Sequence, residues 1–276
     1  MKPFLLCTDL DRTLIPNGKQ TESPKAMERF RQLVNRREVT LVYVTGRHRE
    51  LIEQAIAEFG LPRPDYAIAG VGTTIYRIDT AGWRQSDEWD AQIAPDWQGL
   101  THDELYSWLS VFPALRLQEK EKQNRHKLSF YVPPETDAKK LLGEMDARLK
   151  YAEIKANLIW SIDQKAGVGL LDVLPASANK LHAIRFLMQQ QDFGVEDTIF
   201  AGDSGNDLDV LLSSIPAVLV ANADDEIKEL AEQAHKDTLY IAGGGYLGMN
   251  GNYSAGILEG IAHYHPDVDA WLHGLN

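Results

Sequence analysis

The chain has 276 residues, of which 44% are hydrophobic and 25% charged, so it is long enough for one large or two modest globular domains. Its formal net charge of −12 argues against nucleic acid or an anionic membrane as a general partner, although a bound metal ion or a lysine can still attract a small anionic molecule. The single cysteine, Cys7, excludes an intramolecular disulfide, and its apolar neighbours predict a buried structural thiol.

We expect no targeting signal in this chain. No basic segment precedes a long apolar stretch at the N-terminus, and no apolar run reaches the roughly 18 residues that a membrane-spanning helix needs. We therefore expect neither a signal peptide nor a transmembrane helix, and we expect a cytoplasmic protein. The sequence does not define an oligomeric state, and a monomer is compatible with it.

The first third of the chain alternates apolar strands with amphipathic helices. The expected strands cover residues 4–8, 39–44 and 65–69. The first helix is expected to start at Ser23-Pro24, with serine as the N-cap and proline in the first helical position. A second helix carries an apolar stripe from Leu51 to Phe59. This alternation predicts a parallel sheet covered by helices on both faces.

The middle of the chain has a different pattern. Residues 80–120 are rich in tryptophan and polar residues, and we expect the tryptophans in a hydrophobic core more than stacked on a sugar. The elements expected after them are strands at 127–132, 154–162 and 168–174 and a helix at 135–149. This α+β pattern predicts an inserted, antiparallel cap domain over residues 80–175.

The alternating pattern resumes near Lys180. The expected elements are helices at 179–190, 206–212, 224–234 and 254–263, strands at 198–201 and 217–221, and a glycine-rich loop at 243–245. The predicted fold class is therefore α/β. It consists of a doubly wound, Rossmann-like parallel sheet formed by residues 1–79 and 176–276, with the α+β cap inserted between them.

Two carboxylates, Asp9 and Asp11, follow the first strand, and open parallel sheets bind ligands at the carboxyl ends of their strands. A carboxylate can attack phosphorus and form an aspartyl-phosphate, which splits one difficult step into two easier ones. A second carboxylate two residues away can protonate the departing oxygen and then deprotonate the attacking water. The apolar strand before the pair and Thr13 after it favour catalysis over the alternative, a pair that only caps or closes a turn.

The segment Gly202–Asp207 (Gly-Asp-Ser-Gly-Asn-Asp) follows another expected strand and opens a helix. Mg²⁺ takes hard oxygen ligands in octahedral geometry. Asp203 and Asp207 could complete such a ligand set with Asp9 and with a main-chain carbonyl, that of Asp11. A turn followed by a helix N-cap is the alternative for the same residue types.

Further groups could contact a phosphate. Thr45 and Gly46 offer a hydroxyl and an unhindered backbone N–H at the start of a helix. Arg47 could join the phosphate or reach a sugar, and Asn206 could hold a ligand or a phosphate oxygen. Lys180 could place a cation against the charge that develops in phosphoryl transfer. Taken alone, Arg47 is also compatible with a surface salt bridge, and Lys180 with a solvated surface charge.

Together these residues resemble the four motifs of the haloacid dehalogenase superfamily, in order Asp9 to Thr13, Thr45-Gly46, Lys180 and Gly202 to Asp207. The expected cap, between the second and third motifs, resembles the C2-type cap of the Cof-like branch. A narrower resemblance, to the sucrose-phosphate phosphatase family, lies in residues 5–15, 65–76, 124–129, 172–175 and 254–259.

The resemblance implies that Asp9 is the nucleophile and Asp11 the general acid and base. It also implies that Asp203 and Asp207 serve a Mg²⁺ cofactor. The residues expected at the phosphate are Thr45, Gly46 and Lys180.

The candidates for contacts to the substrate as a whole extend into the cap. They are Thr13, Gly46, Arg47, Asn124, Lys127, Lys165, Asp172 and Asn206. Each cap candidate also has a structural alternative, such as a strand start, a loop or an ion pair. The segment 163–169 is longer than the corresponding loop usual in that family, which leaves the sugar open.

The resemblance implies a Mg²⁺-dependent phosphatase, with sucrose 6-phosphate as the first candidate substrate. Its partner would be a small sugar phosphate rather than nucleic acid or a membrane, with association with an upstream sugar-phosphate synthase as a further possibility. Mannosylfructose-phosphate, a glycosylglycerate phosphate or a phosphomutase reaction are alternatives. A non-catalytic module that binds sugar phosphates is the alternative of a different class.

Overall fold

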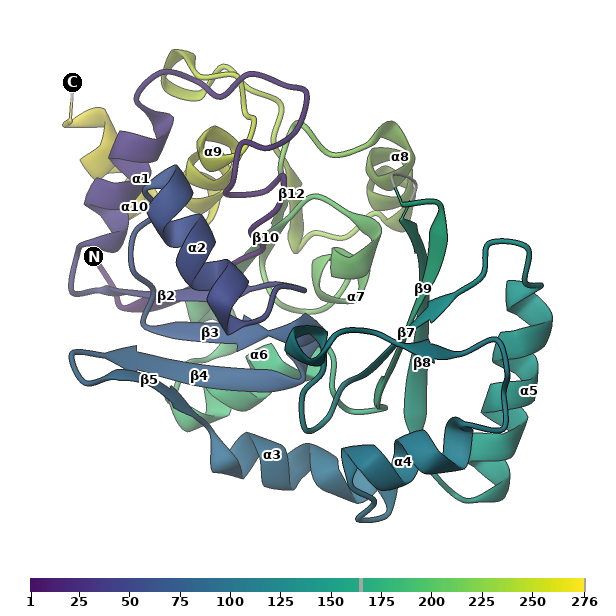
Figure 1. Ribbon diagram of the computed structural model, residues 1–276. Coiled ribbons are helices and arrows are strands. Elements are labelled where there is room, and N and C mark those ends of the chain that lie inside the picture. The colour runs from purple at the N-terminus through teal and green to yellow at the C-terminus, as the bar shows by residue number, and fades with distance from the viewer. Residues whose placement is uncertain (164–165, 276) are drawn as a thin grey trace.

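The computed structural model describes residues 1–163 and 166–275, and a large eight-stranded sheet forms its centre (Figure 1). The strand order is β12-β11-β10-β1-β2-β3-β4-β5, in which neighbours from β12 to β3 are parallel and β4 and β5 are antiparallel. The strands are β1 (Phe4–Thr8), β2 (Val39–Val44), β3 (Tyr66–Ala69), β4 (Thr74–Asp79), β5 (Gly82–Gln85), β10 (Thr198–Gly202), β11 (Ala217–Leu219) and β12 (Leu239–Ile241). The expected doubly wound α/β sheet is thus confirmed.

The central strand β1 is buried at all five positions. Phe4 and Leu6 pack in one hydrophobic cluster, whereas Leu5 and Cys7 pack in another, because successive side chains of a strand point to opposite faces of the sheet. A strand between two helix layers therefore needs an apolar residue at every position, which explains the continuous apolar run. Cys7 is fully buried, as expected.

Helices cover both faces of the sheet. One face carries α1 (Ala26–Val34), α2 (Arg49–Phe59), α9 (Ser254–Tyr264) and α10 (Pro266–His273). The other carries α3 (Asp87–Ile93), α6 (Lys180–Gln190), α7 (Leu208–Leu211) and α8 (Asp225–Ala234). Figure 1 shows α2 and α6 on opposite sides of the sheet. No helix in the described part of the chain has both the length and the apolar character that a membrane crossing requires.

The start of α1 differs from the expectation. The helix begins at Ala26, and Lys25 before it has a left-handed backbone with φ of 65°. The Ser23 hydroxyl accepts a hydrogen bond from the Asn250 backbone N–H at 2.8 Å instead of capping the helix. Ser23 therefore fastens this loop to a distant segment, and no local sequence pattern predicts such a contact.

A second sheet, of four antiparallel strands, lies in the inserted region. Its order is β6-β7-β9-β8, with β6 (Arg116–Leu117), β7 (Leu128–Val132), β8 (Ala156–Asp163) and β9 (Val168–Pro175). Helices α4 (His102–Leu109) and α5 (Ala138–Tyr151) pack with this sheet around a separate hydrophobic cluster. Trp89 and Trp97 are each 1% exposed, so both are core residues.

The expected boundary between residues 79 and 80 falls inside the β4–β5 hairpin. β5 pairs with β4 and so extends the large sheet, and Trp89 and Ile93 of α3 pack in the cluster under that sheet. We therefore propose that the cap insertion starts after α3 and ends at Pro175, with the remaining residues forming the core. Among the described residues, no side chain of β5 or α3 belongs to the hydrophobic cluster of the small sheet, which supports this later boundary.

Gly72 brings the loop after β3 close to the start of α6. Its φ is +99°, and a Cβ at this position would lie 2.4 Å from the carbonyl carbon of Asn179. Asn179 is the N-cap of α6, and its side chain accepts a hydrogen bond from the His182 N–H at 2.9 Å. The close approach therefore fixes the residue directly before Lys180.

We expect Gly72→Ala to lower the free energy of unfolding by about 2–4 kcal/mol, because alanine is strained at this φ and its methyl group overlaps the Asn179 backbone. Gly82→Ala is the matched control, since Gly82 also has a positive φ, of +117°, but no atom within 4 Å of an added Cβ. Chemical denaturation measures both effects. An equal loss in the two variants would show that the contact with Asn179 contributes nothing.

Candidate active site

The ammonium group of Lys180 joins three of the expected site residues. Lys180 is the first residue of α6 and is 3% exposed. Its Nζ donates hydrogen bonds to Asp207 Oδ1 at 2.7 Å, Asp9 Oδ1 at 2.8 Å and Asn206 Oδ1 at 3.0 Å. Asp9 and the segment with Asn206 and Asp207 meet because β1 and β10 are adjacent parallel strands, whose carboxyl ends lie at one edge of the sheet.

The charges in this cluster depend on one another because water is largely excluded from them. Burial alone would lower the pKa of Lys180, but the carboxylates of Asp207 and Asp9 outweigh burial and raise it, so the ammonium stays protonated. Burial raises the pKa of Asp9 to about 7, and without the opposing charge of Lys180 the rise would be larger. The lysine thus stabilises the ionised form of a carboxylate that its surroundings would otherwise protonate.

Three buried carboxylates could hold a metal ion. Asp9, Asp203 and Asp207 each offer an oxygen, and these oxygens lie within 4.8 Å of one another. Asp203 Oδ2 is buried and accepts no hydrogen bond among the described residues, with Arg12 Nε 3.4 Å away, and an oxygen in such a cationic setting fits a cation ligand. Burial, with the nearby charge of Asp207, raises the pKa of Asp203 to about 6. The side chain of Asp11 is not in this group, and ligation through its main-chain carbonyl stays a prediction.

The backbone after β10 holds Asp207 in place. Its Oδ2 accepts hydrogen bonds from the backbone N–H groups of Asp203 at 3.2 Å and Ser204 at 3.3 Å. A Cβ on Gly202 would lie 2.7 Å from the same carboxylate, so the strand end needs a glycine at this point. Thr13 is fully buried and donates from Oγ1 to Asp203 Oδ1 at 3.0 Å, so in this structure it orients a metal-ligand candidate.

Arg12 holds the turn after β1, although the sequence did not single it out. Its φ of 61° is uncommon for a residue other than glycine. Asn222 Nδ2 donates to the Arg12 carbonyl at 2.6 Å, while the guanidinium binds Asp224 at 2.7 Å and lies 3.4 Å from Asp203. The only sequence signal for Arg12 is its position within the first motif, and Asn222 gives none.

Asp11 is bound by Arg47 and Asn17. Arg47 Nη2 and Nε donate to Asp11 Oδ1 at 2.6 Å and Oδ2 at 2.8 Å, and Asn17 Nδ2 donates to Oδ1 at 2.7 Å. Burial opposes ionisation of Asp11, but these contacts outweigh it and hold the pKa of Asp11 below its ordinary value. Arg47, expected at a phosphate or sugar, is therefore engaged by a carboxylate here. Asn17 is a site residue that no sequence pattern indicates.

Thr45 and Gly46 lie at the end of β2, as expected. Thr45 is 1% exposed, and its Oγ1 accepts a hydrogen bond from the Arg47 backbone N–H at 3.2 Å. Gly46 lines a cavity of about 690 Å³ between the core and the cap. Gly46 thus borders the space in which a ligand can lie, and Arg47, the residue after it, binds Asp11.

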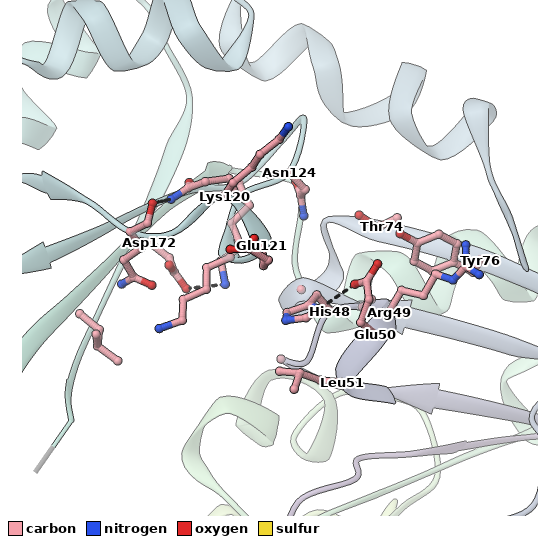
Figure 2. Close-up of a pocket in the computed structure, with 18 of the residues that line it drawn as sticks. His48, Arg49, Glu50, Leu51, Thr74, Tyr76, Lys120, Glu121, Asn124 and Asp172 are labelled. Carbon is pink, nitrogen blue, oxygen red and sulfur yellow. Dashed lines mark hydrogen bonds and ion pairs between the residues drawn. The ribbon is translucent and has the colours of Figure 1, made fainter. Parts of the chain in front are cut away.

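Side chains from both parts of the chain form the walls of this cavity (Figure 2). The core wall includes His48, Arg49, Glu50, Leu51 and Tyr76, and the cap wall includes Lys120, Glu121, Asn124, Lys127 and Asp172. No sequence pattern indicates the core wall, because the charged residues after Thr45-Gly46 also fit the exposed first turn of a helix. Glu50, for example, pairs with His48 at 2.8 Å.

The cap candidates in the described residues all line the cavity. Asn124 Nδ2 donates to Thr73 Oγ1 of the core at 2.9 Å, and Lys127 Nζ lies 3.0 Å from Asp172 Oδ2. Lys165 lies outside the described residues. Asn124, Lys127 and Asp172 each have a partner within the protein and also line the cavity. A structural role for each of them is therefore compatible with a contact to a ligand.

The amino-acid sequence matches a known protein family and several of its members. The family model described as sucrose-6F-phosphate phosphohydrolase matches residues 2–265. A protein of Nitrosococcus oceani described as a HAD-like hydrolase is 52% identical over 273 residues, which is 98% of this chain and 74% of that protein. Mannosylfructose-phosphate phosphatase of Agrobacterium fabrum is 30% identical, over 96% of this chain and 98% of that enzyme. Sucrose-phosphatase 1 of Nicotiana tabacum is 30% identical, but the chain spans only 59% of its length.

A solved structure agrees with these relationships. The sucrose-phosphatase of Synechocystis, in complex with sucrose and phosphate, has a TM-score of 0.73 and 28% identity, over 96% of this chain and 98% of that one. A haloacid dehalogenase-like hydrolase from Bacillus subtilis shares the fold, with a TM-score of 0.67 at 18% identity. The chain therefore belongs to the sucrose-6F-phosphate phosphohydrolase family and is a phosphatase of the haloacid dehalogenase type.

Proposed function

We propose that this phosphatase hydrolyses sucrose 6-phosphate to sucrose and phosphate through an aspartyl-phosphate. The relatives from Agrobacterium fabrum and Nicotiana tabacum are named as phosphatases of sugar phosphates, and the match to the family model over residues 2–265 supports sucrose 6-phosphate as the first candidate. The observation that carries the chemistry is the contact of Lys180 with both Asp9 and Asp207, because it places a charged lysine against the proposed nucleophile and favours its ionised form.

In the proposed first step, Asp9 attacks the phosphorus atom and the sugar oxygen leaves. Lys180 favours the ionised form of Asp9 for this attack and stabilises negative charge on the phosphoryl oxygens. Thr45 and Gly46 bind these oxygens at the end of β2. Asn206, which accepts from Lys180, orients the ammonium.

Asp11 transfers the protons in this scheme. It donates a proton to the departing sugar oxygen and takes one from the water that hydrolyses the aspartyl-phosphate. The ion pair with Arg47 favours the ionised form, which suits the second step. Donation in the first step requires a looser ion pair, and a bound phosphate offers Arg47 a second anionic partner.

The carboxylates of Asp9, Asp203 and Asp207, with the main-chain carbonyl of Asp11, would hold Mg²⁺. The three side chains fit the ion because they supply hard oxygens, one of which has no hydrogen-bond partner in the described chain. When bound, the ion neutralises charge on the carboxylates and on the phosphoryl group. Thr13 and Arg12 hold Asp203 for this purpose.

The cap supplies the contacts that distinguish one sugar from another. Asn124, Lys127 and Asp172 line the cavity with polar groups suited to sugar hydroxyls, and Lys165 is a further candidate. Closure of the cap over the core would exclude water from the aspartyl-phosphate.

Mannosylfructose-phosphate is the second candidate substrate, because the Agrobacterium fabrum phosphatase named for it matches this chain over 98% of its own length. Phosphate release from a panel of sucrose 6-phosphate, mannosylfructose-phosphate and a glycosylglycerate phosphate separates the candidates. A higher kcat/KM for another sugar phosphate would overturn the sucrose assignment. An isomerised phosphate product would indicate a mutase, and tight binding without turnover would indicate a non-catalytic module.

We expect Asp9→Asn to lower kcat by at least about 10³-fold and to abolish the phosphoenzyme, because the amide is not a nucleophile toward phosphorus. Asp146→Asn, on α5 of the cap, is the control and should retain normal turnover. Phosphate release and acid-stable trapping of the phosphoenzyme are the two measurements. Ordinary turnover by the Asp9 variant would refute the nucleophile assignment.

Binding of Mg²⁺ should weaken as the pH falls. The pKa of Asp203 is raised to about 6 by burial and by Asp207, and burial also raises that of Asp9, so protons compete with the cation in mildly acidic solution. We expect the Mg²⁺ concentration for half-maximal activity to rise by about tenfold or more between pH 7 and pH 5. Metal titrations of activity at a series of pH values provide the test, and a constant half-maximal concentration would contradict the account.

A further inference from the structure

The contact between α3 and the cap contains buried polar atoms that the proposed chemistry does not use. Asp90 and His126 are each 5% exposed, and Trp97 is 1% exposed; we call these three residues the junction cluster. Within the described residues, Asp90 Oδ1, both ring nitrogens of His126 and the indole nitrogen of Trp97 have no hydrogen-bond partner. Buried polar groups are normally paired, so this cluster indicates an ordered water or an arrangement that changes.

Asp90 and His126 are close to forming a hydrogen bond. His126 Nε2 lies 3.9 Å from Asp90 Oδ1, which is about 1 Å longer than such a bond. Asp90 Oδ2 accepts a hydrogen bond from Gln85 at 2.9 Å, and the Arg125 guanidinium lies 3.7 Å from it. Burial lowers the pKa of His126, so the ring is neutral and carries one donor and one acceptor. A shift of about 1 Å would give the ring donor a partner.

The two partners belong to different parts of the molecule. Asp90 lies on α3, which is fixed to the core because the neighbouring Trp89 donates its indole N–H to the Gly72 carbonyl at 3.0 Å. His126 lies in the segment 118–127, which supplies most of the cap wall of the cavity. A movement that closes the gap is therefore a movement of this segment toward the core.

The same segment carries two candidates for contacts to the substrate. The Asn124 side chain accepts the His126 backbone N–H at 2.8 Å and donates to Thr73 of the core. Lys127, the next residue, lines the cavity and pairs with Asp172. The His126 backbone is thus hydrogen-bonded to Asn124 and continues directly into Lys127, so a shift of His126 would move the backbone that carries both candidates.

We propose that Asp90 and His126 are positioning residues that form a direct hydrogen bond when substrate occupies the cavity, and so hold the segment 118–127 in its binding position. The inference rests on the proposed function, since it takes the cavity to bind the sugar of a phosphorylated substrate. Neither side chain touches the reacting atoms, so their effect falls on substrate binding.

The kinetic test compares His126→Ala and Asp90→Ala with the wild type on sucrose 6-phosphate and on p-nitrophenyl phosphate, a small ester that does not need the cap wall. We expect KM for the sugar phosphate to rise about tenfold in each variant and no further in the double variant, with kcat/KM for the small ester within about twofold of wild type. His273→Ala is the matched control, because it removes a histidine that pairs with Asp269 on α10, outside the cavity lining. An unchanged KM, or equal losses on both substrates, would overturn the inference.

Hydrogen–deuterium exchange gives a readout that does not depend on turnover. Sucrose with inorganic phosphate should slow exchange in the segment 118–127 of the wild type and slow it much less in His126→Ala. Equal protection in both proteins, which an unchanging water-filled junction would give, or no protection in the wild type, overturns the inference. A wild type that hydrolyses p-nitrophenyl phosphate but no sugar phosphate refutes the proposed function itself, whereas variants that keep the wild-type KM for a good sugar phosphate refute only the positioning role.

Discussion

The site depends on one buried ammonium group that is surrounded by acceptors. Lys180 contacts Asp9, Asp207 and Asn206, and Asp203 completes the carboxylate group beside it. Three carboxylates outnumber Lys180 and the Arg12 guanidinium beside Asp203, so negative charge is in excess here, and buried charge is costly unless it is balanced. The same imbalance that would destabilise an ordinary core makes the cluster complementary to a divalent cation and, with that cation bound, to a phosphoryl group.

The architecture brings these groups together from distant parts of the sequence. β1 and β10 are neighbours in the sheet, so the residues that follow them share one edge, and the N-terminus of α6 adds the lysine. Gly72 and Asn179 tie this helix to the loop after β3. The cap then meets the same edge through the segment 118–127, so that residues at the sheet edge line one side of the cavity and polar side chains of the cap line the other (Figure 2).

The sequence predicts the parts of this structure that follow from repeated or local patterns. The continuous apolar run of β1 predicts a buried parallel strand, and the acidic segments after β1 and β10 predict a shared carboxylate site. The β4–β5 hairpin, β12 and α10 are short and have no strong period, so they were not expected. Contacts between residues far apart in the fold could not be predicted from local patterns either. Ser23 binds Asn250 instead of capping α1, and Arg47 and Asn17 bind Asp11. Such pairings depend on which loops the sheet order brings side by side.

A crystal structure grown with Mg²⁺ and trifluoroberyllate, a stable mimic of a phosphoryl group on a carboxylate, tests the central claim most directly. The account predicts the mimic bonded to a carboxylate oxygen of Asp9, within hydrogen-bond distance of Lys180, and a cation held by Asp9 and Asp203. A mimic bonded to a different side chain, or a cation bound away from these carboxylates, would contradict it.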